Sequence, residues 1–63
     1  MKYAEVRGAI RAKFGTQVAF AEAMGMHYTT LSGKLQGRTD WTRDEMELVC
    51  KLLELPVAVF FTL

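Results

Sequence analysis

Few side chains in this chain of 63 residues could do covalent or acid–base chemistry. The single histidine, His27, cannot supply a zinc-finger ligand set, and the single cysteine, Cys50, cannot form an intramolecular disulfide. The carboxylates of Asp44, Glu45 and Glu47 stand close together, but at a predicted helix start, where acidic groups offset the helix dipole. Because no nucleophile, base and orienting group stand together, we predict no enzyme activity, no metal site and no cofactor. The chemistry that remains is binding.

Length and composition predict one small globular domain over residues 1–63. The hydrophobic fraction of 51% argues against disorder. A chain of this length hides only about 60% of its unfolded surface, so a single core must stabilise it, and little room is left for an enzyme cleft. No apolar run approaches the roughly 18 residues of a membrane span, and no signal segment opens the chain. We therefore expect a soluble protein of a reducing compartment.

The net charge of +1 conceals an uneven distribution along the chain. Residues 1–38 carry six basic and two acidic side chains, whereas residues 39–63 carry two basic and five acidic ones. The first part thus has a charge of +4 and the second a charge of −3. The net charge alone does not indicate a nucleic-acid binder, but the basic first part points weakly in that direction.

Apolar residues repeat at helical spacing along most of the chain, and no alternation long enough for a strand is present. Gly15 and Gly25 predict helix ends, because glycine readily takes the left-handed conformation, and Pro56 ends a further helix. Thr42 and Glu45 form a predicted capping box. The five predicted helices are Tyr3–Phe14, Gln17–Met24, a third from His27 or Tyr28 to Gln36, a fourth from the Thr42 cap to about Leu53, and Val57–Phe61.

The most informative segment is Thr16–Gln36, in which two helices of about eight residues meet through a tight turn. Gly25 supplies the positive φ that such a turn needs. Ala21 is small enough for the close crossing of the two helices. This arrangement is typical of a helix-turn-helix unit.

With these features the chain resembles the helix-turn-helix domains of phage repressors and Cro proteins, also called the xenobiotic-response-element type. The resemblance covers nearly the whole chain. The residues that carry it are the pair Thr16-Gln17, Ala21 and Gly25, the pair Gly37-Arg38, and Trp41 before a capped helix. It implies an all-α, five-helix bundle of the lambda-repressor-like kind. It also implies a sequence-specific regulator of transcription that binds double-stranded DNA.

The resemblance implies that the third helix lies in the major groove, where its outer face meets base edges. The residues mapped onto that role are His27, Tyr28, Thr29, Ser32 and Gly33. None of these is Arg, Asn or Gln, so strong two-bond contacts to bases are missing and DNA shape is expected to contribute to specificity. The expected phosphate contacts are Gln17, Lys34, Gln36, Arg38 and Arg43. About four neutralised phosphates would give a log–log salt slope near −4.

Two positions depart from the family pattern. Family members carry an apolar residue three positions after Leu31, where this chain has Lys34. They also begin the third helix with Ser or Thr, whereas His27 is a poorer cap. These departures predict an altered packing or rotation of the third helix.

The uncharged segment Val57–Leu63 is expected to serve both the core and a homodimer. Val57 together with Phe60 or Phe61 is predicted to close the core. The resemblance places the family's dimer contacts around this segment, here on Val57, Val59, Phe61 and Leu63. A symmetric dimer would read two half-sites about 34 Å apart.

The favoured hypothesis is a phage or prophage repressor or Cro-like protein that occupies an operator as a dimer. The expected partners are operator DNA and a second copy, with no membrane and no small-molecule ligand, and the expected location is the cytoplasm of a bacterial or phage-infected cell, at the nucleoid. One alternative is a protein-interaction module on the same fold without DNA binding. Another is the DNA-anchoring domain of a phage packaging subunit.

Overall fold

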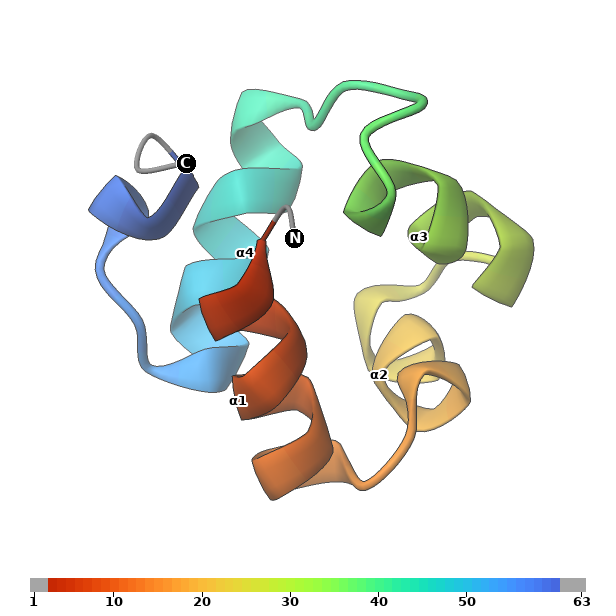
Figure 1. The fold of residues 1–63 in the computed structure, drawn as a ribbon, viewed down its shortest axis with the longest axis horizontal. Coiled ribbons are helices and arrows are strands. Elements are labelled where there is room, and N and C mark those ends of the chain that lie inside the picture. The colour runs from red at the N-terminus through yellow and green to blue at the C-terminus, as the bar shows by residue number, and fades with distance from the viewer. Residues whose placement is uncertain (1–2, 61–63) are drawn as a thin grey trace.

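The structure, a computed structural model, describes residues 3–60, and all regular elements in that range are helical (Figure 1). They are α1 (Ala4–Phe14), α2 (Gln17–Met24), α3 (Tyr28–Leu35), α4 (Arg43–Leu53) and the short 3₁₀ helix η1 (Val57–Phe60). The predicted all-α class is confirmed. The predicted fifth helix is not an α-helix but four residues of 3₁₀ helix.

The helix boundaries follow from local capping. The Thr16 hydroxyl accepts a hydrogen bond from the Ala19 amide at 3.1 Å, as expected for an N-cap residue. Thr42 and Glu45 form the predicted capping box, with reciprocal bonds of 2.9 and 3.1 Å. The first helix begins one residue later than predicted, because Tyr3 adopts a left-handed conformation with a φ of 56°.

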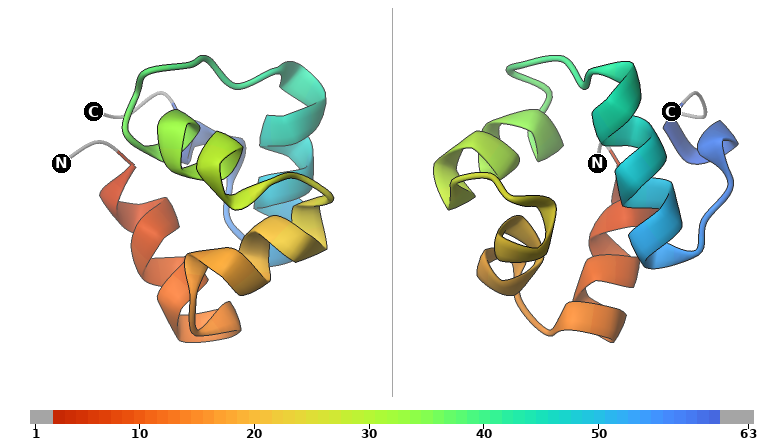
Figure 2. Two further views of the ribbon diagram at one scale, coloured as in Figure 1. Left: turned by 90° about the vertical axis from the view of Figure 1, so that its right-hand side faces the viewer. Right: turned by 180° about the vertical axis from the view of Figure 1, so that it is seen from behind.

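The interior is built from apolar side chains of every helix. α2 packs against both α1 and α3, and α4 packs against α1, α2 and η1 (Figure 2). The buried apolar residues are Val6, Ile10, Phe20, Ala21, Met24, Leu31, Leu35, Val49, Cys50, Leu53, Val59 and Phe60. Cys50 is one of these core residues.

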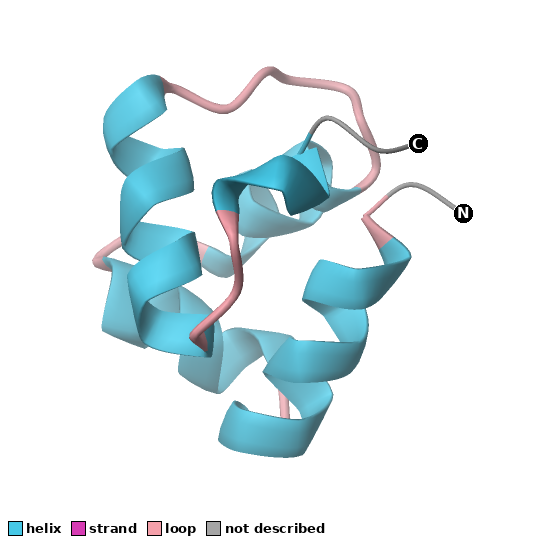
Figure 3. Cartoon of the chain, turned by 90° about the vertical axis from the view of Figure 1, so that its left-hand side faces the viewer, coloured by secondary structure: helices cyan, strands magenta, loops and turns pink. Residues whose placement is uncertain are grey.

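An aromatic cluster joins the start of the described chain to its end. The ring of Tyr3 lies 6.1 Å from Trp41 and 5.8 Å from Phe60, and the rings of Trp41 and Phe60 are 5.3 Å apart. Figure 3 shows η1 lying between α1 and α4, where this cluster forms. The Trp41 indole N–H is buried and has no hydrogen-bond partner within residues 3–60.

α3 lies at the edge of the molecule. It packs mainly on α2, and in Figure 1 it forms the right-hand border of the fold. When that side is turned to the viewer, as in the left panel of Figure 2, α3 lies in front of the other helices. One face of α3 is therefore left uncovered by the other described helices.

Within residues 3–60, no helix is both long and apolar enough to span a lipid bilayer.

Candidate functional site

A tight turn joins α2 to α3 and sets their relative positions. Gly25 takes the left-handed conformation with a φ of 73°, as predicted, and its amide bonds the carbonyls of Ala21 and Glu22. The amide of Met26 donates to the Ala21 carbonyl at 3.0 Å. These bonds satisfy the carbonyls at the end of α2 and turn the chain within two residues into α3. Ala21 itself is 1% exposed at the contact between the helices.

The first turn of α3 is open to solvent. His27, Tyr28 and Thr29 are all exposed, Tyr28 by 42%. His27 is a more effective cap than its residue type predicted, because Nδ1 of its ring accepts a hydrogen bond from the Thr29 amide at 3.2 Å. The expected weakness at the start of this helix is therefore absent.

Ser32 and Gly33 lie on the next turn and are half-buried. The Ser32 hydroxyl accepts a hydrogen bond from the Gln36 amide group at 3.0 Å. A Cβ added to Gly33 would meet only the Thr39 hydroxyl, at an ordinary contact distance of 3.6 Å. Packing inside the protein therefore does not require glycine at this position.

The last turn of α3 is held by a buried charge. Lys34 is 7% exposed, and its ammonium group donates to the Asp40 carbonyl at 2.8 Å and to the Glu45 carboxylate at 2.9 Å. The same group lies 5.8 Å from the centre of the Trp41 ring. Lys34 thus faces inward, with its aliphatic stem in the interior and its charge paired.

This pairing corrects the prediction that Lys34 contacts a phosphate. Its ammonium is already bonded to two oxygens at the base of the loop that joins α3 to α4. Releasing it would leave the partly buried Glu45 carboxylate without its cation, which is costly. We therefore exclude Lys34 from the residues that face outward to a ligand.

The electrostatics of Glu45 reflect the same network. Burial raises the pKa of this carboxyl, but the hydrogen bond from the Thr42 amide and the charge and hydrogen bond of Lys34 more than offset it. As a result, the pKa of Glu45 lies below its ordinary value. The carboxylate remains charged at neutral pH and connects the end of α3 to the start of α4.

Three of the other predicted phosphate contacts, Gln36, Arg38 and Arg43, lie at the surface after α3. Arg38 donates a hydrogen bond to the side-chain carbonyl of Gln36, and the side-chain nitrogen of Gln36 donates one to the Ser32 hydroxyl. These bonds connect an exposed guanidinium to the outer face of α3. The side chain of Arg43 is 88% exposed and pairs with Glu47 one turn later at 3.5 Å. Such a surface pair contributes little, so Arg43 remains available to another anion.

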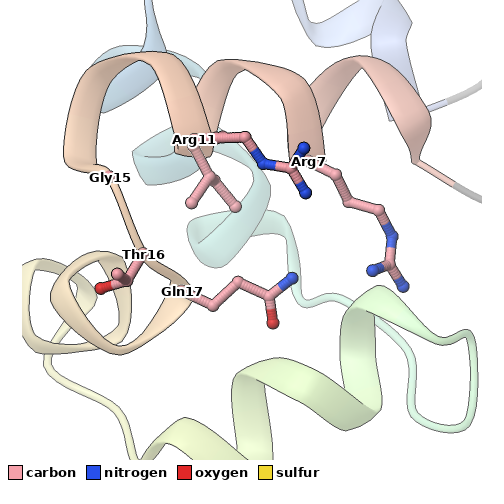
Figure 4. A pocket seen from close by; sticks show the side chains of 6 residues that line it. Arg7, Arg11, Gly15, Thr16 and Gln17 are labelled. Atoms are coloured by element: carbon pink, nitrogen blue, oxygen red, sulfur yellow. The ribbon is translucent and has the colours of Figure 1, made fainter.

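A pocket of about 230 Å³ lies where α1 meets the start of α2. Its polar walls come from Arg7, Arg11, Thr16 and Gln17. Figure 4 shows the side chains of Arg7 and Gln17 extending into the space between α1 and α3, with the Arg11 side chain running along α1 toward Arg7. One Arg7 nitrogen donates to the Leu35 carbonyl at the end of α3, at 2.8 Å. Two guanidinium groups beside a helix N-terminus favour an anion.

The sequence-based prediction included Gln17 but missed Arg7 and Arg11. The available signal was their spacing of four residues on one helix, which places both on the same face of α1. What the sequence could not show is that this face lies over the start of α2, because that depends on how the two helices pack. The pocket is therefore a tertiary feature.

The predicted dimer residues divide into three groups. Val57 is 45% exposed, whereas Val59 is 6% exposed and belongs to the core. The prediction that Val59 faces a partner is therefore wrong, because the tight winding of η1 turns Val59 and Phe60 inward together. Of the residues expected to close the core, Phe60 does so and Val57 does not. Phe61 and Leu63 lie outside the described residues.

The thiol of Cys50 and the carboxylate of Glu54 lie in surroundings that do not indicate a catalytic role. Burial raises the pKa of the Cys50 thiol, which makes it a poor nucleophile. A hydrogen bond from Lys13 lowers the pKa of the exposed Glu54. In residues 3–60, no three His, Cys, Asp or Glu side chains gather as a metal site would require. The described surface offers hydrogen bonds from α3 and positive charge from the arginines.

Comparison with known proteins identifies a family for this chain. No curated protein matches this chain. The model of the family described as "Protein of unknown function (DUF739)" matches residues 1–61. Since this match covers nearly the whole sequence, the chain belongs to the DUF739 family.

Proposed function

We propose that this protein is a sequence-specific regulator of transcription that binds double-stranded DNA through a helix-turn-helix formed by α2 and α3. The observation that carries the proposal is the exposed, uncharged outer face of α3 together with the arginine-lined pocket at the start of α2. The first provides hydrogen-bonding groups for base edges, and the second provides positive charge for the phosphate backbone. A basic surface without such an exposed helix would support only non-specific binding.

Size is compatible with this mode of binding. An α-helix with its side chains is about 10–12 Å wide, and the major groove is about 12 Å wide. The described chain measures 24 × 23 × 23 Å, so a groove-bound α3 leaves the rest of the molecule against the flanking backbone. In this arrangement His27, Tyr28, Thr29, Ser32 and Gly33 face the bases.

The phosphate contacts that we propose differ from the sequence-based set. Gln17, Gln36, Arg38 and Arg43 are retained, Lys34 is removed and Arg11 is added. Arg7 connects the pocket to the end of α3, which places α3 and the pocket in a fixed relation. A phosphate at the pocket would thereby fix the register of α3 along the groove.

In this proposal the protein acts by occupying an operator, as do the phage repressors and Cro proteins that it resembles. It does so as a homodimer. Val57 remains the described residue of the predicted dimer surface, because it is exposed and apolar next to the core residues of η1. A dimer related by twofold symmetry would recognise an inverted repeat.

The direct test is selection of bound sequences from a random pool of duplex DNA, followed by titration of the selected site. We expect enrichment of an inverted repeat with half-sites about one helical turn apart. Failure to bind any duplex at low salt would reject the proposal and favour a protein-interaction module. Binding without sequence enrichment, by rings of subunits in light scattering, would favour a packaging role.

The pocket can be tested by Arg11→Ala on the selected site. Loss of one phosphate contact should weaken binding to all sequences alike, by roughly threefold to tenfold, and should reduce the steepness of the log–log salt slope by about 1. Lys51→Ala is the matched control, because it removes one positive charge from an exposed position in the last turn of α4. An equal effect of both variants would show that only net charge matters.

A further inference from the structure

Two hydrogen bonds at the start of α3 converge on the same atom. Nδ1 of His27 lies 3.2 Å from the Thr29 backbone nitrogen and 2.9 Å from the Thr29 hydroxyl oxygen. Both residues are exposed and belong to the face that we assign to DNA. The polarity of these two bonds decides which groups Thr29 can offer to a base.

The backbone bond determines the state of the histidine ring. An amide N–H can only donate, so Nδ1 of His27 must be an acceptor and carries no proton. The neutral ring then bears its proton on Nε2. Since Nδ1 has no proton to give, the bond to the Thr29 hydroxyl must run in the other direction, with the hydroxyl donating.

This direction removes an ambiguity that threonine normally has. A free hydroxyl can donate to or accept from any base, which makes it a poor discriminator. In this structure the only hydrogen of the Thr29 hydroxyl is used by His27. The oxygen therefore presents lone pairs alone, and the hydroxyl can only accept from a base.

We propose that His27 is a specificity-determining residue that makes Thr29 an obligate hydrogen-bond acceptor, so that Thr29 selects bases with an amino group in the major groove. Those bases are adenine, through N6, and cytosine, through N4. Guanine and thymine present acceptors at the corresponding positions and would face the Thr29 lone pairs. This inference rests on the proposed function, because it assumes that α3 enters the major groove.

The first test uses the free protein and does not depend on DNA. The ¹⁵N chemical shifts of the His27 ring above neutral pH report which nitrogen carries the proton. We expect an unprotonated Nδ1 and a proton on Nε2. A proton on Nδ1 would overturn the inference and leave the proposed DNA binding untouched.

The second test compares base preferences of four proteins: wild type, His27→Ser, Thr29→Val and the double variant. Serine retains an N-cap acceptor, but its own hydroxyl can donate, so it does not force the polarity of Thr29. The position read by Thr29 is the one whose preference changes in Thr29→Val. There, replacing the adenine or cytosine of the base pair by its analogue without the exocyclic amino group should weaken binding of wild type about fivefold more than binding of either single variant, as the loss of one hydrogen bond typically does.

The double variant tests whether His27 acts through Thr29. If His27 acts through Thr29, the double variant should show the same preference as Thr29→Val, because the two changes remove one shared interaction. An equal effect of the amino-free analogue on wild type and Thr29→Val, or an undiminished effect on His27→Ser, would overturn the inference alone. Absence of any sequence preference in wild type would overturn both this inference and the proposed sequence-specific function.

Discussion

The two ends of α3 are held in opposite ways. At its last turn, Lys34 is buried and bonded to the Asp40 carbonyl and the Glu45 carboxylate, and Arg7 donates to the Leu35 carbonyl from α1. At its first turn, the side chain of the exposed His27 bonds to the hydroxyl and the amide of Thr29, within the same turn. The last turn is thus bonded to α1 and α4, whereas these side-chain bonds of the first turn stay within that turn.

This difference separates positioning from recognition. Changes at the last turn must disturb the orientation of the whole helix, because they break contacts with α1 and α4. Changes of Tyr28 or of the Thr29 side chain at the first turn, which leave the His27 cap in place, alter mainly the groups that are presented to solvent. A short helix can therefore vary its recognition surface without loss of stability, provided that its far end remains fixed.

Lys34→Ala should have the largest effect on stability. The variant loses the packed aliphatic stem of Lys34 and leaves Glu45 without its cation, so we expect the free energy of unfolding to fall by about 2 kcal/mol. Urea denaturation measures this. Lys34→Met, which retains much of the stem without the charge, should recover about half of the loss. An unchanged stability in Lys34→Ala would contradict the assigned role of the last turn.

Gly33→Ala tests a position between the two ends of α3 for its separate effects on stability and on DNA binding. Gly33 is helical and a Cβ there meets no close contact, so alanine should raise the free energy of unfolding by about 0.5–1 kcal/mol. The same methyl group would project toward the groove and weaken binding to the selected site. Thermal unfolding and a binding titration measure the two effects.

Gly8→Ala is the matched control for Gly33→Ala. Gly8 is also helical with no atom near an added Cβ, but it lies in α1. We expect a similar gain in stability with unchanged DNA affinity. Equal affinities for the two variants would remove Gly33 from the recognition surface.

Glu45→Gln should lower the stability at neutral pH, because the buried Lys34 ammonium loses its anion, and the smallest effect that we predict is the change in the pH dependence of this variant. The pKa of Glu45 is lowered in the folded protein from its ordinary value of 4.5. The ionised carboxylate therefore stabilises the fold at pH values above 4.5, and this contribution is lost as the pH falls below 4.5. Glutamine can still complete the capping box but does not titrate. The stability of the variant should therefore decline less on acidification, by under about 1 kcal/mol in urea titrations. Superimposable pH profiles would contradict the lowered pKa.

Local signals in the sequence predicted most of the fold. Thr16, Gly25 and the Thr42–Glu45 pair act on their own neighbours, so their roles could be inferred from a few consecutive residues. The end of the chain was less predictable. A 3₁₀ helix and an α-helix turn different residues of Val57–Phe60 inward, and residue types alone do not distinguish them.

The candidate site was predictable only where it is local. The exposed face of α3 follows from helical periodicity, because Leu31 and Leu35 mark the opposite, buried side. The inward position of Lys34 does not follow from helical periodicity, because its partner Glu45 lies on another helix. The predicted role of Glu45 in the capping box gave no sign that it also bonds Lys34. The Arg7–Arg11 pocket likewise depends on the packing of α1 against α2.

The aromatic cluster gives the molecule a built-in spectroscopic reporter. Trp41 is the only tryptophan in the sequence, and its indole N–H is buried without a hydrogen-bond partner in the described part of the chain. Its fluorescence should therefore be blue-shifted in the native state and should move to longer wavelength when Tyr3, Phe60 and the loop after α3 separate. Because the first turn of α3 takes no part in this cluster, a ligand bound there would leave the emission unchanged. The emission of Trp41 can thus report unfolding in an unlabelled sample, whether or not a ligand is bound at that turn.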